Sequence, residues 1–204
     1  MRSDLNDTFG NIDIYLFDQL LRGRITPADR VLDAGCGSGR NLVYLLRSGC
    51  DVYAADASPD AVAAVRELAA ELAPHLAPDH FRVEPLDAMT FPEGFADVVI
   101  SSAVLHFAPD DDAFDAMLSG TWRMVRPGGL FFCRLASSIG IEDRVRRIAG
   151  RRHALPDGSE RYLADEAMLL DRTRQLGGRL LDPLKTTVVQ DQRSMTTWVV
   201  RRDG

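Results

Sequence analysis

The stretch VLDAGCGSGRN, from Val31 to Asn41, constrains the fold more than any other part of the sequence. It joins a short apolar run to a helical pattern through a loop with glycine at alternate positions, Gly35, Gly37 and Gly39. Glycine lets the backbone adopt positive φ and approach a ligand closely. A strand, a glycine loop and a helix in this order predict a ligand-binding unit of an α/β sheet.

The spacing of the glycines differs from that of the common nucleotide-binding loops. The dinucleotide fingerprint is G-x-G-x-x-G, which is missing here, and no Gly-Lys-Ser/Thr follows as it would in a P-loop. Asp33 stands two residues before the first glycine, where a carboxylate repels a diphosphate but suits a ligand with an ammonium group. Capping of the loop by Asp33 is the alternative interpretation.

The rest of the chain alternates between short apolar runs and amphipathic helical patterns, which is typical of βαβ units. The patterns predict strands at 31–33, 51–55, 81–84, 96–101 and 130–134, and helices at 12–21, 41–48, 59–72, 111–125 and 165–175. Two further strand-like runs, about 184–190 and 196–201, are close enough to form an antiparallel hairpin. We therefore expect a mostly parallel sheet that finishes in a hairpin.

Composition and charge narrow the class of protein. The chain has 204 residues with 46% apolar content and no dividing linker or repeat, so we expect a single domain over 1–204. A net charge of −6 argues against a protein that coats nucleic acid or an anionic membrane. No apolar run reaches eighteen residues, and no signal-peptide pattern is present. Three cysteines without CxxC spacing predict free thiols and a cytoplasmic location.

Acidic residues follow the next two predicted strands. Asp56 ends the second strand, where a carboxylate accepts hydrogen bonds from ribose hydroxyls, although it also suits a helix cap. Asp87, Ala88 and Met89 follow the third strand, where an aspartate and a backbone N–H are able to read an adenine edge while Met89 packs on the ring. Because parallel strands end at the same edge of a sheet, we expect these residues to lie near the glycine loop.

With these motifs in order, the sequence resembles the class I S-adenosylmethionine-dependent methyltransferases. The resemblance covers nearly the whole chain and rests on VLDAGCGSGRN, YAADAS, LDAM, FADVVISSAVLHF and VRPGGLFF. More loosely, it extends to the small-molecule branch that includes tellurite-resistance and quinone-biosynthesis methyltransferases. It implies an α/β, Rossmann-like three-layer sandwich with a seven-stranded, mostly parallel sheet and an antiparallel C-terminal hairpin.

The resemblance also implies a cofactor, S-adenosyl-L-methionine, and a set of residues that bind it. Asp33 and the first glycines would line the methionine moiety, Asp56 would hold the ribose, and the segment from Asp87 would hold the adenine. The implied cofactor-binding residues are Asp33, Ala34, Gly35, Gly37, Gly39, Asp56, Ala57, Asp87, Ala88, Met89, Ser101 and Ser102. Residues 1–28 are expected as a helical segment over the cofactor, and the arginine-rich residues 137–163 as a lid or insertion near the acceptor.

The expected activity is in-line methyl transfer to a small-molecule acceptor, without a nucleic acid or membrane partner. Neither an Asn-Pro-Pro-Tyr motif nor a Pro-Cys nucleophile is present, which argues against methylation of nucleic acid bases. The rival interpretation is a non-catalytic protein that binds S-adenosylmethionine or S-adenosylhomocysteine.

Two residues are candidates for the acceptor side. His106 follows the fourth strand and is the candidate general base, with packing in an apolar turn as the alternative. Arg134 ends the fifth strand and is the candidate clamp for an acceptor anion, with a salt bridge inside the domain as the alternative. We expect no metal, because Asp110, Asp111 and Asp112 are typical of a helix start. The arginine cluster at 144–152 is expected as a solvated surface or as a contact for an anionic acceptor or partner.

Overall fold

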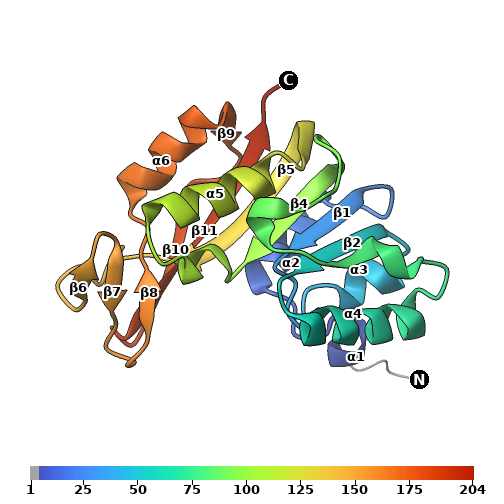
Figure 1. Cartoon of the computed structure of the whole chain (residues 1–204), viewed down its shortest axis with the longest axis horizontal. Helices are drawn as coiled ribbons and strands as arrows, with labels where there is room; N and C mark the ends of the chain where they lie inside the picture. The colour runs from blue at the N-terminus through green and yellow to red at the C-terminus, as the bar shows by residue number, and fades with distance from the viewer. Residues whose placement is uncertain (1–4) are drawn as a thin grey trace.

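The computed structural model describes residues 5–204 and centres on one twisted sheet (Figure 1). The strand order is β10-β11-β5-β4-β1-β2-β3. The strands are β1 (Arg30–Ala34), β2 (Asp51–Asp56), β3 (Phe81–Val83), β4 (Ala96–Ser102), β5 (Val125–Ala136), β10 (Lys185–Val189) and β11 (Arg193–Arg202). Neighbouring strands from β3 to β5 are parallel, and β11 is antiparallel to both β5 and β10. The predicted seven-stranded, mostly parallel sheet and its C-terminal hairpin are confirmed.

The hairpin has two features that the sequence patterns did not predict. A short strand, β9 (Gly178–Leu180), pairs with the far end of β11 on the same edge as β10. The hairpin turn places Gln190 and Asp191 at φ of 50° and 55°, and the N–H of Gln192 donates to the carbonyl of Val189 over 3.0 Å. Positive φ at both central residues matches the right-handed twist of the strands and fixes their register.

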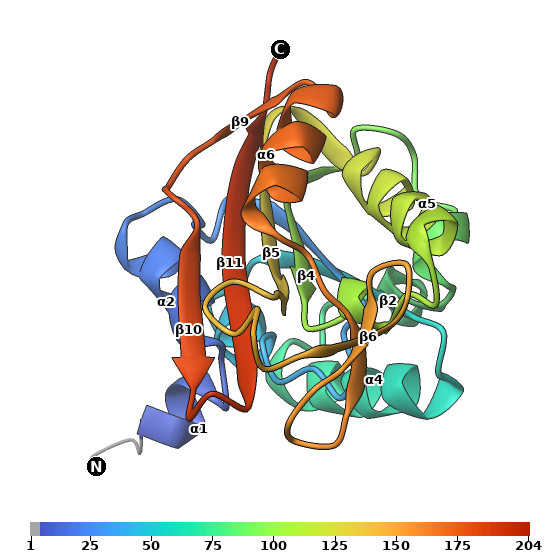
Figure 2. The ribbon, with the colours of Figure 1, turned by 90° about the vertical axis from the view of Figure 1, so that its left-hand side faces the viewer.

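Two hydrophobic cores make the fold a three-layer sandwich. The helices are α1 (Leu5–Phe9), α2 (Ile14–Leu21), α3 (Val43–Arg47), α4 (Pro59–Leu72), α5 (Asp111–Trp122) and α6 (Glu166–Gln175). Successive strand residues point to opposite faces, so Val31 joins the core with α2, α3 and α4 while Leu32 joins the core with α5 and α6. Figure 2 shows α2 and α5 on opposite sides of the sheet. None of the described helices is long and apolar enough to span a membrane.

The N-terminal segment forms two helices, whereas the patterns predicted one helix from residue 12. The chain turns at Gly10, which has φ of +61°, and Asp13 then caps α2 by accepting the N–H of Tyr15 over 2.9 Å. The next predicted helix begins at Val43 instead of residue 41, because the side chain of Asn41 accepts the backbone N–H of Asp13 over 3.0 Å. Residues 1–4 of the expected N-terminal segment lie outside the described residues.

The insertion at 137–163 contains an ordered three-stranded antiparallel sheet, β6 (Arg146–Ala149), β7 (Arg152–Ala154) and β8 (Glu160–Tyr162). The chain turns between these strands with positive φ at Gly150 and Gly158, a conformation that glycine adopts readily. Tyr162 fixes this small sheet to α5, because its ring stacks on Phe114 at 4.6 Å and its hydroxyl donates to Asp111 over 2.7 Å. The small sheet lies beyond the β10–β11 end of the large sheet (Figure 1).

Gly120 sets how closely α5 approaches the turn η2 (Leu86–Ala88), and we expect Gly120→Ala to destabilise the fold. An added Cβ would lie 2.1 Å from the carbonyl oxygen of Leu86 and 2.8 Å from Cα of Asp87, both of them backbone atoms. Relief requires a backbone shift, so the free energy of unfolding should fall by about 1–3 kcal/mol in urea denaturation. Ser119→Ala on the exposed face of the same helix is the control. Equal stability of the two variants would contradict this contact.

Candidate functional site

Two cavities open at the carboxyl ends of the parallel strands, and the adjacent residues Ala103 and Val104 contribute to their linings. The glycine-loop cavity has a volume of about 280 Å³ and is lined by residues that include Gly35, Asp56, Ala57, Leu86, Asp87 and Met117. The arginine cavity has a volume of about 250 Å³ and is lined by residues that include His106, Arg134, Leu155, Asp157, Arg161 and Arg193. Val104 lines the first cavity and Ala103 the second. Ala103 has φ of 65°, a conformation that non-glycine residues seldom adopt and that often marks a functional site.

The glycine loop requires glycine at its first position. Gly35 has φ of +82°, and an added Cβ would lie 2.5 Å from Cγ2 of Val104. Gly37 also has positive φ, but an added Cβ there would meet no atom within 4 Å, so its backbone faces open space. Gly39 packs against Val65 and Leu68 of α4. The loop is therefore fixed at both ends and exposes its middle.

Asp56, at the end of β2, holds the glycine loop through a hydrogen bond. One of its carboxylate oxygens accepts the N–H of Gly37 over 2.9 Å, and the other accepts the N–H of Ser58 over 2.9 Å. Ser58 caps α4 by accepting the N–H of Ala61, so the capping role that competed for Asp56 belongs to Ser58. Asp56 lines the glycine-loop cavity beside Ala57, and each oxygen keeps a lone pair for a ligand hydroxyl.

Asp33 is buried beneath the glycine loop without full compensation. It is 1% exposed, and within residues 5–204 its Oδ2 has no hydrogen-bond partner. Burial raises the pKa of Asp33 to about 7, while the nearby Arg40 guanidinium opposes this rise and the Asp56 carboxylate adds to it. An unpaired buried carboxylate oxygen is costly, and such groups often indicate a binding site.

The segment after β3 contributes differently from the sequence-based expectation. Asp87 lines the glycine-loop cavity, and Ala88 follows it in an exposed position. Met89 is 1% exposed and packs in the core with α5, so its side chain is not among the cavity-lining groups. Leu86 and Met117 supply the apolar lining that was expected from Met89. Ala34 likewise lies in the core, at the end of β1.

The serines at the end of β4 lie between the glycine loop and the N-terminal segment. Ser101 is fully buried, and its Oγ has no hydrogen-bond partner in the described part of the chain. Ser102 accepts a hydrogen bond from Nη2 of Arg40 over 3.0 Å. The same Arg40 nitrogen lies 3.8 Å from the Asp13 carboxylate. The sequence patterns did not single out Arg40, although it stands in the glycine-loop motif, and they missed Asp13, which no periodicity or motif distinguishes.

Arg134 forms the salt bridge that the sequence left open as an alternative. Its Nη1 donates to Oδ2 of Asp13 over 2.8 Å, and its guanidinium carbon lies 5.5 Å from the ring centre of Tyr15. The Asp13 side chain is fully buried, and Arg134 Nε has no partner among the residues described. Arg134 therefore joins the N-terminal segment to β5 while it also lines the arginine cavity.

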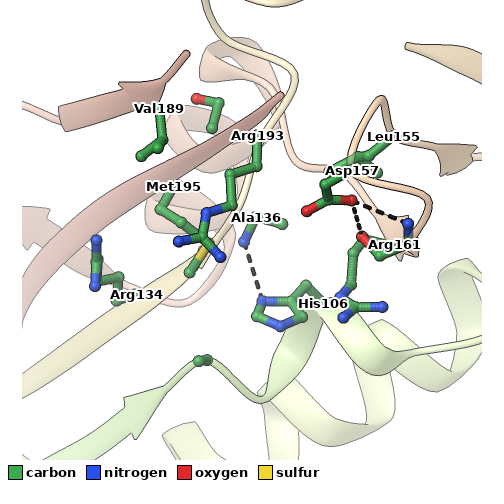
Figure 3. Close-up of a pocket in the computed structure, with 12 residues that line it drawn as sticks. His106, Arg134, Ala136, Leu155, Asp157, Arg161, Val189, Arg193 and Met195 are labelled. Carbon is green, nitrogen blue, oxygen red and sulfur yellow. Dashed lines mark hydrogen bonds between the residues drawn. The ribbon is translucent and has the colours of Figure 1, made fainter. Parts of the chain in front are cut away.

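His106 lines the arginine cavity, but one of its ring nitrogens is occupied (Figure 3). The backbone N–H of Ala136 donates to Nδ1 of His106 over 3.1 Å. Burial, together with the positive charge of Arg161, lowers the pKa of His106 to about 4. At neutral pH the ring is uncharged, Nδ1 accepts, and the proton resides on Nε2.

Comparison with known proteins identifies the family. A family model described as a methyltransferase domain matches residues 32–133, which is half of the chain. An uncharacterized methyltransferase of Synechocystis is 36% identical over 109 residues, which cover 52% of this chain and 47% of that protein. The malonyl-(acyl-carrier protein) O-methyltransferase of Enterobacter lignolyticus is 32% identical over 142 residues, which cover 68% of this chain and 51% of that protein. The chain belongs to the methyltransferase domain family, whose cofactor is S-adenosylmethionine.

A solved structure shows the same fold. It is the 1,6-didemethyltoxoflavin-N1-methyltransferase of Burkholderia thailandensis, crystallised with 1,6-didemethyltoxoflavin and S-adenosylhomocysteine. The TM-score is 0.69 at 21% identity, and the match covers 93% of this chain and 76% of that one. The chain spans about half the length of the first curated relatives that it matches.

Proposed function

We propose that this chain transfers a methyl group from S-adenosylmethionine to a small-molecule acceptor. The observation that carries the proposal is the buried Asp33 carboxylate with an unpaired oxygen under the glycine loop. When bound, S-adenosylmethionine supplies a methyl group that its sulfonium sulfur has already activated. Asp33 would bind the ammonium group, Asp56 the ribose, and Asp87 with the Leu86 and Met117 side chains the adenine.

The protein's contribution to such a reaction is alignment and exclusion of water. Adjacent residues line the two cavities, Val104 the glycine-loop cavity and Ala103 the arginine cavity, so a donor in the first would lie next to an acceptor in the second. We assign to residues 137–163 the role of a lid, because Leu155, Asp157 and Arg161 of that insertion line the arginine cavity. A cytoplasmic location is supported by three buried free cysteines, Cys36, Cys50 and Cys133.

We propose that His106 positions the acceptor through its Nε2 proton and does not remove a proton from it. The free lone pair of the neutral ring is on Nδ1, which the Ala136 N–H occupies. We expect the turnover number at saturating cofactor to show no titration of His106 between pH 5.5 and 8, because the folded-state pKa is about 4. An inflection near pH 6.5 that disappears in His106→Gln would restore the general-base role.

The rival function is binding of the cofactor or its demethylated product without catalysis, and it is favoured because the lone pair of the neutral His106 ring is occupied by the Ala136 N–H. Methyl transfer does not always need a base, so the two functions are distinguished by product formation. The test uses methyl-labelled S-adenosylmethionine, purified protein and a panel of small acceptors that carry oxygen, nitrogen, sulfur or carbon nucleophiles. Label transferred to an acceptor, and lost in Asp33→Asn, supports methyl transfer. Cofactor binding without labelled product across the panel supports the rival.

A further inference from the structure

The arginine cavity is rich in positive charge in a chain whose net charge is −6. Figure 3 shows the side chains of Arg161 and Arg193 entering from opposite walls, Arg161 from β8 and Arg193 from β11. The two residues are 32 positions apart in the sequence and belong to strands of two different sheets. The cavity therefore combines cations from two independent elements.

Neither guanidinium forms an ion pair at contact distance with another described residue. Across residues 5–204, no carboxylate oxygen lies within 4.0 Å of Arg161 or Arg193, whereas Arg134 is paired with Asp13. Arg161 donates to the carbonyl of Glu160 over 2.7 Å and lies 4.9 Å from the ring centre of Phe107. Both contacts leave further N–H groups of its fork for a ligand.

The carboxylate that lines the same cavity, Asp157, is engaged elsewhere. Its Oδ1 accepts both the backbone N–H of Ser159 over 2.9 Å and the Ser159 hydroxyl over 2.6 Å. These bonds hold the turn before β8 and keep Asp157 ionised, and the charges of Arg161 and Arg193 lower its pKa further. One carboxylate thus faces two guanidinium groups, which leaves positive charge for a ligand to balance.

Part of the remaining lining is apolar and part carries hydroxyl groups. Leu155 comes from the connection between β7 and β8, and Ala136, Val189 and Met195 come from the large sheet, while Ser159 and Ser194 add hydroxyls. The volume of about 250 Å³ lies just below the usual range for small-molecule pockets, about 300–1,000 Å³, and therefore suits a compact ligand. A ligand that matches both kinds of wall has a compact apolar body and an anionic group.

We propose that the acceptor is a small organic acid whose carboxylate is bound by Arg161 and Arg193. The proposal rests on the proposed function, because it assigns the arginine cavity to the acceptor. Arginine suits this role because its planar fork binds a carboxylate through two parallel hydrogen bonds. A carboxylate held there leaves the rest of the molecule to extend along Ala136 toward Ala103, whose neighbour Val104 lines the glycine-loop cavity.

The test measures ligand binding to the protein saturated with S-adenosylhomocysteine. The probes are benzoate, a set of short-chain and monocyclic carboxylates, the neutral amide of each acid, and phenyl phosphate. The variants are Arg161→Gln and Arg193→Gln. Arg174→Gln is the matched control, because Arg174 is exposed on α6 and pairs only with Asp171 of the same helix. Affinity for S-adenosylhomocysteine is measured first in every variant.

We expect at least one acid to bind at least tenfold more tightly than its amide. Each cavity variant should lose at least tenfold of that affinity, while Arg174→Gln and the affinity for S-adenosylhomocysteine stay unchanged. Acids that bind no better than their amides, or no loss in the variants, would overturn the acceptor assignment and leave the proposed function intact. Tighter binding of phenyl phosphate than of every carboxylate would overturn the carboxylate in favour of a phosphate. Failure to bind S-adenosylhomocysteine would remove the proposed function itself.

Discussion

Asp33→Asn should weaken the binding of S-adenosylmethionine about 100-fold and at the same time stabilise the free protein at pH 8. The weaker binding follows because the variant removes a buried charge that we assign to the ligand's ammonium group, an interaction worth several kcal/mol when desolvated. The greater stability follows because the variant removes a carboxylate that is 1% exposed and lacks full compensation. Calorimetric titration and urea denaturation measure the two effects.

The pH dependence of this effect has a definite sign. The folded-state pKa of Asp33 is about 7, above its ordinary value of 3.8, so the folded protein binds the proton more tightly than the unfolded chain. Protonated Asp33 stabilises the folded protein relative to the unfolded chain. This stabilisation is complete below pH 3.8 and is lost as the pH rises through 7. The pKa shift of Asp33 corresponds to a change of at most about 4 kcal/mol in the free energy of unfolding. The advantage of Asp33→Asn should therefore be largest at pH 8 and nearly absent at pH 4.

Wild-type affinity for the cofactor should depend on pH in the opposite direction. The ionised carboxylate is the binding form, so the dissociation constant should rise up to about tenfold per unit as the pH falls below 7. Asp33→Asn should abolish this dependence. Two results would contradict the role assigned to Asp33. One is an Asp33→Asn variant that binds the cofactor as tightly as wild type does, and the other is an Asp33→Asn variant that is less stable than wild type at pH 8.

Asp13→Ala should lower the free energy of unfolding by about 3–5 kcal/mol. Asp13 is fully buried at its side chain and is the anion that pairs with Arg134 across 121 positions of sequence. Removing it leaves a largely buried guanidinium without a counter-charge, and this is the costly way to break such a pair. It also removes the cap of α2, which is worth about 1 kcal/mol.

The comparison for this variant is Asp18→Ala in the same helix. Asp18 forms ion pairs with Arg22 and Lys185, but its side chain is 32% exposed, so its loss should cost at most about 1 kcal/mol. Asp13→Asn keeps one of the two acceptor oxygens, so it retains the bond to the Tyr15 N–H or the bond to Arg134 but not both, and its stability should lie between the other two. Urea denaturation of the three variants under one set of conditions measures the order. A loss for Asp13→Ala no larger than that for Asp18→Ala would contradict the buried pair.

The parts of the site that follow from local sequence were predictable. Asp33, Gly35, Asp56 and Asp87 each sit at or just past the end of an apolar strand pattern, and parallel strands bring such ends to one edge. The same logic predicted the sheet and its C-terminal hairpin. Met89 was expected beside the adenine because it follows Asp87, but the short turn before it directs its side chain into the core.

The remainder of the site depends on contacts between distant segments. The partner of Arg134 is Asp13, and the cavity beside it also needs Arg161 and Arg193, which lie in different strands. No pattern in the sequence specifies which of the many arginines meet, because these pairings are set by how the insertion and the hairpin pack. The ordered strands β6, β7 and β8 were missed for a related reason. Their residues are polar and half-exposed, so they lack the apolar alternation that predicts a strand.

The most direct test of the central claim is calorimetric titration of S-adenosylmethionine and S-adenosylhomocysteine against wild type and Asp56→Ala. NAD is the control ligand, and Asp60→Ala, in the exposed first turn of α4, is the control variant. We expect micromolar binding of both sulfur ligands to wild type and to Asp60→Ala. Binding should be lost in Asp56→Ala, because the variant removes both the hydrogen bond from the Gly37 N–H and the proposed acceptor for the ribose hydroxyls. Absence of binding by either sulfur ligand, or tighter binding of NAD, would contradict the assignment of the glycine-loop cavity to this cofactor.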